Sequence, residues 1–485
     1  MARIALALAA LCALVLAPMG AASPTMDVGA AEDLARVPVF VDAKAQFELA
    51  ASAGMNVVRV TALWRPGMSA PDASTASLFE TTSQAATLSG IRLIVSVYPA
   101  VNRQVPLDAT SRAEFASFAA GLAAAVPTLN DFIIGNEPNL NFFWLPQYNA
   151  DGTSASPKAY VELLAKTYDA LKRVRPDIEV IGGSVSPAGT DTPDGLRPTH
   201  SPGNFILGMG DAYRATGRSR PLMDAFAFHP YGAKSVTPPA AQNPNTMRIS
   251  LADYGKLVAF LGQAFDGTGQ RGSDLPIVYD EYGVQSIVPV EKQSLYVEQA
   301  SPAAADAVPE ELQAAYYRTA LELAFCQPTV TAFLFFHTVD ERDLRRWQSG
   351  LFYPDLAPKT SFAPVRDAVL LARRGILATC PGLSVDAEPI RVEFPARTRV
   401  PARNRRWRVI AGCVQDCVYV ARLEKLPKGS TTFAKSGVLV GGKVQQLALP
   451  ARRVARGMYR LTLRLAVRVN PGAPVEFASE PIEVG

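Results

Sequence analysis

Histidine, cysteine and long apolar runs are all scarce in this chain of 485 residues. The three histidines, His200, His229 and His337, lie far apart in the sequence, and the cysteines have no spacing typical of a metal site. No glycine-rich phosphate-binding motif follows an early strand-like run, which argues against a dinucleotide-binding fold. We therefore expect neither a metal nor a cofactor.

One long apolar run lies at the N-terminus, within MARIALALAALCALVLAPMGAAS. An arginine, an apolar stretch and small residues at 20–23 are typical of a secretory signal peptide, and the run is too short and wrongly flanked for a stable membrane anchor. Cys12 follows Leu11, whereas a lipid-modified cysteine usually follows a small residue, so we expect cleavage near Ala22. The sequence predicts a leader over 1–23, no transmembrane anchor, and a secreted or extracellular protein, with cell-wall association left open.

The composition, 48% hydrophobic and 19% charged, is typical of a globular protein and argues against disorder. The length exceeds that of one compact core, so we expect two domains. Residues 386–485 contain 18 Lys or Arg and 8 Asp or Glu, which gives +10, and the rest carries −6 of the total of +4. This basic excess is either a solvated face or a surface for an anionic cell-envelope glycan. Without a recognised motif it does not indicate nucleic-acid binding.

From about residue 55 to 375, apolar β-branched runs alternate with helix-like segments. The strand-like runs are NVVRVTAL, IRLIVSVYP, FIIG, IEVIGGSVS, MDAFAFHPYG, PIVYDEYG and TAFLFFHTVD. The helix-like segments are 42–53, 111–126, 157–176, 201–217, 249–265, 309–325 and 361–375. With a weaker first strand at 24–29, this pattern predicts an α/β fold, a (β/α)₈ TIM barrel over 24–382. A doubly wound open sheet is the alternative.

After Gly382 the pattern changes to short alternating runs separated by Gly, Pro and Asn. Examples are RRWRVIAGC, CVYVARLEKL and YRLTLRLAVRV. Such runs predict a C-terminal β-sandwich over 383–485.

Four cysteines remain after removal of the leader, an even number that an exported protein can pair. Cys413 and Cys417 are close enough in sequence to staple a hairpin or loop. Cys326 would then pair with Cys380, and the alternative is that Cys326 is a buried thiol.

Two glutamates stand at the carboxyl ends of predicted strands. Glu137 follows FIIG within Asn136-Glu137-Pro138, and Glu281 ends the run at 276–281 directly after Asp280. By strand count these are strands 4 and 7, whose carboxyl ends face the active site of a barrel. Two carboxyl groups across a barrel mouth can hydrolyse a glycosidic bond, because one protonates the leaving oxygen while the other attacks the anomeric carbon.

Together these motifs resemble glycoside hydrolase clan A, whose members are retaining enzymes on (β/α)₈ barrels. The resemblance covers residues 25–375 and depends on NEP after strand 4 and DEYG after strand 7. Arg59, at the predicted end of strand 2, and His229-Pro230-Tyr231, after strand 6, are similar to clan positions. The segment 347–352 resembles the loop after strand 8 in families 5 and 39. Each motif alone is a weak signal.

The resemblance implies a role for each residue. Glu137 would be the general acid/base and Glu281 the nucleophile, with carboxyl groups about 5–5.5 Å apart. Asn136 would bind the sugar 2-hydroxyl, and Arg59 would keep Glu281 ionised, unless Arg59 only forms a buried ion pair. Asp280 is the alternative to Glu281 as nucleophile; since side chains alternate along a strand, only one of the two is expected to face the barrel interior.

The sugar-binding residues are predicted with alternatives. Tyr231 would donate to Glu281, and His229 would bind a sugar hydroxyl unless it is purely structural. Strand 8 has no tryptophan at its end, so Phe336, His337 or Trp347 would replace the tryptophan common in the clan. Tyr98 stands where family 5 often has histidine. Trp144, in the aromatic segment 139–144, would offer a stacking platform or pack its own loop.

The leading hypothesis is a secreted, monomeric, retaining glycosidase that cleaves β-linkages of a poly- or oligosaccharide. The alternative is a non-catalytic glycan-binding or cell-envelope protein on the same barrel. The joint presence of Arg59, Asn136, Glu137, Tyr231 and Glu281 favours the enzyme. The sugar, endo or exo action, and hydrolysis or transglycosylation all stay open.

Overall fold

The computed structural model describes residues 26–298, 306–373, 389–401, 407–413, 417–427, 430–440, 443–449, 454–467 and 475–485. The predicted leader, Cys380 and the predicted domain boundary at 382 lie outside these ranges. In the described part of the chain, no helix is both long enough and apolar enough to cross a membrane.

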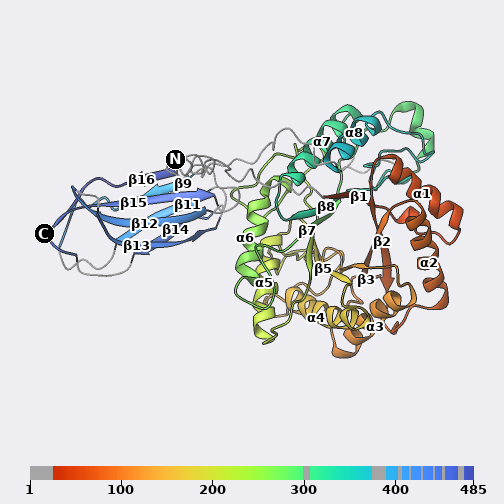
Figure 1. The fold of residues 1–485 in the computed structure, drawn as a ribbon, viewed down its shortest axis with the longest axis horizontal. Coiled ribbons are helices and arrows are strands. Elements are labelled where there is room, and N and C mark those ends of the chain that lie inside the picture. Colours follow the sequence, from red (N-terminus) through yellow and green to blue (C-terminus); the bar gives the residue numbers. More distant parts are fainter. Residues whose placement is uncertain are drawn as a thin grey trace, which may run out of the picture.

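Eight parallel strands close into a barrel in chain order, which confirms the predicted (β/α)₈ fold (Figure 1). The strands are β1 (Asp27–Ala31), β2 (Val57–Trp64), β3 (Arg92–Pro99), β4 (Asp131–Ile134), β5 (Glu179–Val185), β6 (Ala225–Phe228), β7 (Ile277–Tyr282) and β8 (Val330–Phe336). The helices between and after them are α1 (Phe40–Ser52), α2 (Ala73–Leu88), α3 (Ala109–Ala125), α4 (Ser156–Val174), α5 (Pro202–Ala215), α6 (Tyr254–Phe265), α7 (Glu310–Phe325) and α8 (Phe362–Arg373). The described connections also hold the short 3₁₀ helices η1 (Asp33–Ala35), η2 (Leu251–Asp253) and η3 (Val290–Leu295).

Two layers of apolar side chains hold the barrel together. The larger layer lies between the strands and the ring of helices. The smaller layer comes from strand residues alone, namely Val57, Ile94, Ile133, Ile181, Ala225, Ala227, Val278, Ala332 and Leu334. Because alternate residues of a strand face the same side, Arg59 and Thr61 follow Val57 on the same face of β2. The barrel interior therefore changes from apolar to polar towards the carboxyl ends of the strands.

The barrel closes where β1 pairs with β8, a place called here the seam, and the Glu32 side chain stabilises it. Its buried carboxylate accepts hydrogen bonds from the backbone N–H of Leu34 at 3.0 Å, of Thr338 at 2.9 Å and of Val339 at 3.1 Å. The first and last strands of the barrel are thus joined at the point where their loops begin.

Helix α2 and the position of β1 differ from the sequence prediction. The α2 sequence, ASTASLFETTSQAATL, was missed because its many Ser and Thr residues lower helix propensity and blur the apolar period. The Asp72 side chain caps α2 by accepting from the Thr75 N–H at 2.7 Å. Strand β1 spans Asp27–Ala31 rather than 24–29.

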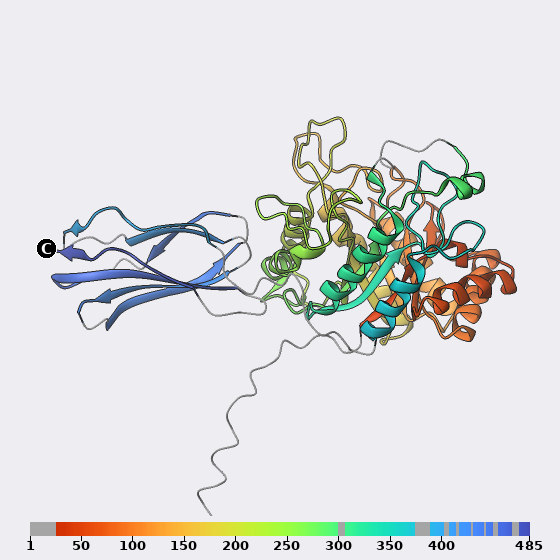
Figure 2. The same ribbon diagram turned by 90° about the horizontal axis from the view of Figure 1, so that it is seen from above.

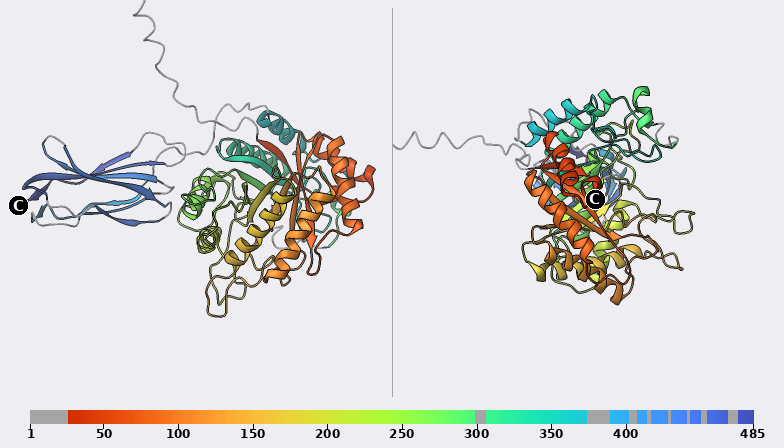
Figure 3. Two further views of the ribbon diagram at one scale, coloured as in Figure 1. Left: turned by 60° about the horizontal axis from the view of Figure 1, so that its bottom comes forward. Right: turned by 90° about the vertical axis from the view of Figure 1, so that its right-hand side faces the viewer.

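The C-terminal part of the chain forms two antiparallel-rich sheets with a core of their own, as predicted (Figures 2 and 3). One sheet has the order β10-β17-β15-β12-β13, with β16 beside β15, and the other has the order β14-β11-β9. The bounds are β9 (Pro389–Glu393), β10 (Arg399–Val400), β11 (Trp407–Cys413), β12 (Cys417–Lys425), β13 (Ser430–Leu439), β14 (Gln445–Leu449), β15 (Gly457–Val467), β16 (Val475–Ala478) and β17 (Ile482–Val484).

The predicted disulfide between Cys413 and Cys417 is wrong. Both residues are buried, and Cys417 is a free thiol, so it forms no disulfide with Cys413. Cys413 ends β11 in one sheet and Cys417 begins β12 in the other. Cys326 is disulfide-bonded, while Cys380, its expected partner, lies outside the described residues.

Tyr160 on α4 replaces a missing sheet hydrogen bond beside the candidate site. Pairing of β4 with β5 ends at Ile133 and Ile181. Beyond this point the Tyr160 hydroxyl donates to the Ile134 carbonyl at 2.6 Å and accepts from the Gly183 N–H at 2.7 Å. A side chain therefore bridges the two strands directly before Asn136 and Glu137.

Replacement of Tyr160 by Phe removes this bridge and leaves two buried backbone groups without a partner. We expect the free energy of unfolding to fall by about 1–3 kcal/mol, measured by urea denaturation with tryptophan fluorescence. Tyr316→Phe is the control, because its hydroxyl bonds to the Val236 carbonyl in an exposed position. Equal stability of Tyr160→Phe and the wild type would contradict the bridge.

Candidate active site

A pocket of about 1000 Å³ opens at the carboxyl ends of the barrel strands. Its lining includes both predicted catalytic glutamates together with Arg59, Asn136 and Tyr231. Residues from the loops after β1, β4, β5, β6 and β8 complete its walls. The structure thus brings together groups that are far apart in sequence; Arg59 and Glu281, for example, are separated by 222 positions.

The backbone before Glu137 turns sharply out of β4. Gly135 has a φ of +95° and Glu137 has a φ of +39°, a left-handed conformation that is uncommon for a residue with a side chain. The Glu137 N–H donates to the Ser184 carbonyl at 2.8 Å, and Ser184 is itself left-handed, with a φ of +50°. Such strained positions cluster at functional sites and are held by the surrounding structure.

The expectation that only one of Asp280 and Glu281 faces the interior is wrong. The register of β7 against β8 shifts between Tyr279 and Tyr282, which interrupts the regular alternation of side chains. Both carboxylates therefore contact Arg59, at 2.9 Å for Asp280 and 2.8 Å for Glu281. Glu281 lines the pocket, while Asp280 is fully buried beneath it.

Arg59 lies in the interior of β2 and does not end it, since β2 pairs with β3 as far as Trp64 and Pro99. The long side chain nevertheless reaches the site. Its Nη1 donates to both carboxylates of β7, and its Nη2 donates to Asn136 Oδ1 at 3.0 Å. One buried guanidinium therefore aligns the nucleophile candidate and the amide beside Glu137.

His229 lies between the two glutamates. Its Nδ1 is 3.0 Å from Glu137 Oε1 and 3.4 Å from Glu281 Oε2. These two contacts together limit the separation of the two carboxylate oxygens to 6.4 Å. On the far side of the ring, Nε2 is 3.0 Å from Ser184 Oγ and 3.3 Å from Asp280 Oδ2. Tyr231 donates to Glu281 Oε2 at 3.1 Å.

Charges fix the protonation of the groups around the glutamates. Burial lowers the pKa of His229, but the carboxylates of Glu281 and Asp280 outweigh burial and raise it to about 10. Burial likewise opposes the charge of Arg59, yet Glu281 and Asp280 raise its pKa above the usual range. Burial raises the pKa of Asp280, and His229 and Arg59 reverse this and lower it. The site therefore holds an imidazolium, a guanidinium and an ionised Asp280 near neutral pH.

Aromatic side chains form the wall of the pocket on the β8 side. Trp347 reaches in from the loop after β8 and packs on Tyr231 and Phe336, with ring centroids 5.2 Å and 5.5 Å away. His337 also lines this wall and adopts a φ of +75°. All three residues considered for the missing strand-end tryptophan thus lie at the pocket.

Trp144 does not form the predicted stacking platform. It is buried and packs edge-on against Tyr160, with a centroid distance of 5.9 Å. The pocket is lined instead by Phe142, which is 74% exposed, and by Phe143, which packs on Tyr98. The loop turns between Phe143 and Trp144, so neighbouring aromatic residues face opposite sides.

Sequence reasoning missed Ser184 and considered Asp280 only as the alternative to Glu281 as nucleophile. The Ser184 hydroxyl donates to Asp280 Oδ2 at 2.8 Å and contacts His229, so these residues form the floor of the site. Two glycines before Ser184, in IEVIGGSVS, were a sign of unusual backbone at the end of β5. Nothing in the sequence placed that turn beside β7.

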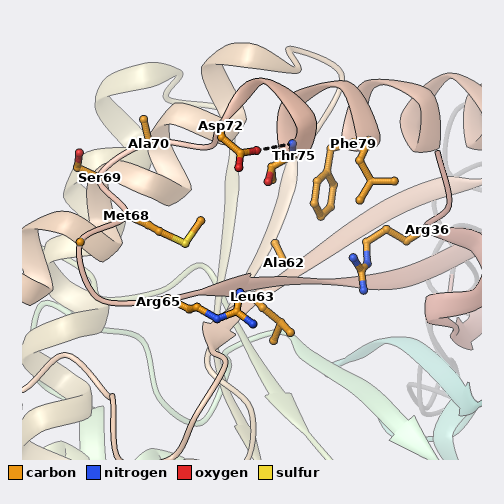
Figure 4. Close-up of a pocket in the computed structure, with 12 residues that line it drawn as sticks. Arg36, Ala62, Leu63, Arg65, Met68, Ser69, Ala70, Asp72, Thr75 and Phe79 are labelled. Atoms are coloured by element: carbon orange, nitrogen blue, oxygen red, sulfur yellow. Dashed lines mark hydrogen bonds between the residues drawn. The ribbon is translucent and has the colours of Figure 1, made fainter.

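No group of three or more His, Cys, Asp or Glu side chains suited to a metal ion occurs in the described part of the chain. A second hollow, of about 590 Å³, lies between β2 and α2 (Figure 4). Arg36, Arg65, Met68 and Phe79 are among its lining residues, and its one carboxylate, Asp72, caps α2. It has no pair of carboxylates of the kind found at the barrel mouth.

The chain matches no protein-family model and no curated protein sequence. Among solved structures it is similar to a family 39 glycoside hydrolase from the gut symbiont Bacteroides cellulosilyticus WH2, with a TM-score of 0.50 and 15% identity over 88% of this chain and 81% of that chain. A GH5_18 protein from Streptomyces cattleya, solved in complex with GlcNAc, has a TM-score of 0.49 and 17% identity over 78% and 84% of the two chains. These neighbours are glycoside hydrolases of the clan that the sequence resembles, and at such identities the likeness concerns the fold.

Replacement of His229 by Asn tests the charge assignment through pH. The folded pKa of about 10 lies above the ordinary 6.5, so the imidazolium contributes its full stability below pH 6.5 and loses it as pH rises towards 10. We expect the destabilisation of His229→Asn relative to the wild type to be largest at pH 6 and to shrink towards pH 10 in urea titrations.

His200→Asn is the matched control. Burial lowers the pKa of His200 to about 4, so this histidine is neutral throughout that range. Its loss of stability should be constant from pH 6.5 to pH 10. The same flat profile for His229→Asn would refute the buried imidazolium.

Proposed function

We propose that this protein is a secreted retaining glycosidase that cleaves β-linkages of a poly- or oligosaccharide. Glu137 is the general acid/base and Glu281 is the nucleophile. The observation that carries the proposal is the contact of both carboxylates with one nitrogen of His229, which keeps their oxygens within 6.4 Å. A retaining pair has carboxyl groups about 5–5.5 Å apart, whereas an inverting pair needs about 6.5–9.5 Å to admit a water molecule.

In the first step, a Glu281 oxygen attacks the anomeric carbon and forms a glycosyl ester. The bond from that carbon to the leaving oxygen breaks, and Glu137 transfers its proton to the leaving oxygen. In the second step, Glu137 removes a proton from water, which attacks the same carbon and releases Glu281. Two inversions give net retention, and a sugar acceptor in place of water would give transglycosylation.

The buried charges support this change of role. Arg59 and the His229 imidazolium supply two positive charges, and Asp280 and Glu281 supply two negative charges. These four groups balance in charge without Glu137, so the proton that the first step requires on Glu137 leaves no uncompensated charge among them. Ester formation removes the charge of Glu281, and a negative Glu137 then restores the balance and can act as a base.

The remaining groups are suited to position a sugar. Asn136 accepts from Arg59 through Oδ1, which leaves its amide N–H groups for the 2-hydroxyl. Tyr231 keeps its proton, because burial and Glu281 raise its pKa well above the ordinary value, and so it donates to the nucleophile. Trp347 and Phe336 offer aromatic faces for the C–H side of a sugar ring. Secretion through the N-terminal leader, and a glycan partner for the basic C-terminal sheets, are further parts of the proposal.

Loss of Glu281 should abolish turnover in a way that azide restores. We expect wild type to release the aryl group from at least one member of a panel of aryl β-glycosides, and Glu281→Ala to be at least about 10⁴-fold slower. Sodium azide should rescue the variant and yield the α-glycosyl azide. Glu311→Ala, on the exposed start of α7, is the matched control with wild-type turnover. Undiminished activity of Glu281→Ala would overturn the assignment of the nucleophile.

The stereochemistry gives an independent test of the separation of the carboxylates. Proton NMR of an ongoing digestion should detect the β-anomer of the new reducing sugar first, with the α-anomer growing in later by mutarotation. An α-anomer as the first product would indicate inversion and would contradict the proposed double displacement.

A further inference from the structure

Arg248 lies at the edge of the catalytic pocket, in the loop between β6 and η2. Its Nη2 donates to the Gly232 carbonyl at 2.8 Å, which places the guanidinium one residue from Tyr231. The next N–H along the chain, that of Ile249, donates to the Pro187 carbonyl at 3.0 Å and ties this loop to the one after β5. Arg248 is therefore held at the β5–β6 side of the pocket, while Trp347 and its loop come from β8.

Arg248 differs from the other arginines that line this pocket. Arg59 pairs with Asp280 and Glu281, Arg345 lies 2.7 Å from Asp343, and Arg346 lies 3.4 Å from Glu341. Within the described residues, no carboxylate lies within 4.0 Å of Arg248. Asp253 affects the pKa of Arg248 only by a longer-range electrostatic attraction, because the Asp253 carboxylate is itself bound by Lys256 and Asn243.

The guanidinium also has unused hydrogen-bonding capacity. Arg248 is half-buried: its Nε is enclosed by protein and Nη2 donates to Gly232, whereas Nη1 donates to none of the described residues. The end of the guanidinium formed by Nη1 and Nη2 is therefore the part that can meet a ligand in the pocket. A buried donor without a partner costs free energy, and an arginine at the surface normally finds a carboxylate or water. The planar arrangement of guanidinium donors fits two oxygens of one anionic group. An arginine kept in this state beside a substrate pocket is suited to bind a charge that arrives with the substrate.

We propose that the substrate is an acidic glycan and that Arg248 binds an anionic substituent of the sugar held on the β5–β6 side of the pocket. The inference rests on the proposed glycosidase activity and narrows its substrate class. A uronic acid carboxylate and a sulfate ester share the required pair of oxygens. Arg248 is then a specificity-determining residue, while the cleavage chemistry belongs to Glu137 and Glu281.

The test compares substrates that differ only in charge. β-Linked oligosaccharides that contain glucuronic acid are each paired with their carboxyl-reduced glucose counterparts, and a second set pairs 6-O-sulfated with unsulfated oligosaccharides. We expect the wild type to have a kcat/KM about 10- to 100-fold higher for the acidic member of a pair. Arg248→Met should remove most of this preference, and Arg248→Lys should retain part of it. The set that responds identifies the anion as carboxylate or sulfate.

Binding provides a readout that does not need turnover. In the background of Glu281→Gln, calorimetry should give a lower Kd for acidic than for neutral oligosaccharides, and Arg248→Met should abolish the difference. Arg318→Met is the control, since it removes an equal charge from the exposed face of α7, where Arg318 pairs with Glu322. It should leave the acid-to-neutral ratio unchanged.

The outcomes separate the two proposals. Equal kcat/KM and Kd for acidic and neutral members in the wild type, or a preference that survives Arg248→Met, would overturn the acidic-glycan inference and leave the glycosidase intact. Preferential binding of acidic oligosaccharides through Arg248, with no turnover dependent on Glu281, would support the anion subsite and overturn the proposed hydrolysis.

Discussion

The site depends on a single constraint: two cations must stabilise three carboxyl groups in the closed interior of a barrel. Arg59 alone joins β2, the turn after β4 and the end of β7. Without it, the adjacent and nearly inaccessible side chains of Asp280 and Glu281 would have to share His229 as their cationic partner, which is unfavourable. Asp280 does not line the pocket, but its carboxylate helps to raise the pKa of His229 and so favours the charged imidazolium. His229 in turn contacts both glutamates. The two glutamates at the pocket are therefore positioned by buried electrostatics as much as by the strands that precede them.

The aromatic wall is supported by a different buried network. Lys359 donates to Asp340 at 2.8 Å and to Ser286 at 2.7 Å beneath the loop that carries Trp347, and Tyr296 donates to the same Asp340 at 2.6 Å. This satisfied polar cluster holds a long loop in a defined shape. Trp347 comes from this loop and packs on Tyr231 at the pocket, so the aromatic surface of the pocket depends on the packing of the loop.

The sequence was sufficient for the barrel, the sandwich and the residues brought to the barrel mouth, because apolar period and strand-end chemistry are local signals. Prediction from the sequence failed where the orientation or pairing of a side chain depends on contacts between residues distant in sequence. The shift in register of β7 brought Asp280 to Arg59 against the rule of alternation. Trp144 turned into the core because Tyr160 offered it a packing partner. Cys413 and Cys417 lie on strands of different sheets, which their spacing in the sequence does not reveal. The sequence also could not show that Arg248 has no ion-pair partner among the described residues, because this depends on which residues surround it in the folded pocket.

The seam fastened by Glu32 has a consequence for the order of events during synthesis and export. Strand β1 is the first barrel strand to be made, yet one of its two neighbours, β8, comes about 300 residues later, and the Glu32 carboxylate has no partner on that side until Thr338 exists. Pairings so distant in sequence form late, because a long loop must close first. For a chain exported as proposed, the segment next to the leader therefore stays unpaired on one edge until almost the whole barrel has been made. Translocation can begin at the N-terminus without having to unfold a finished domain.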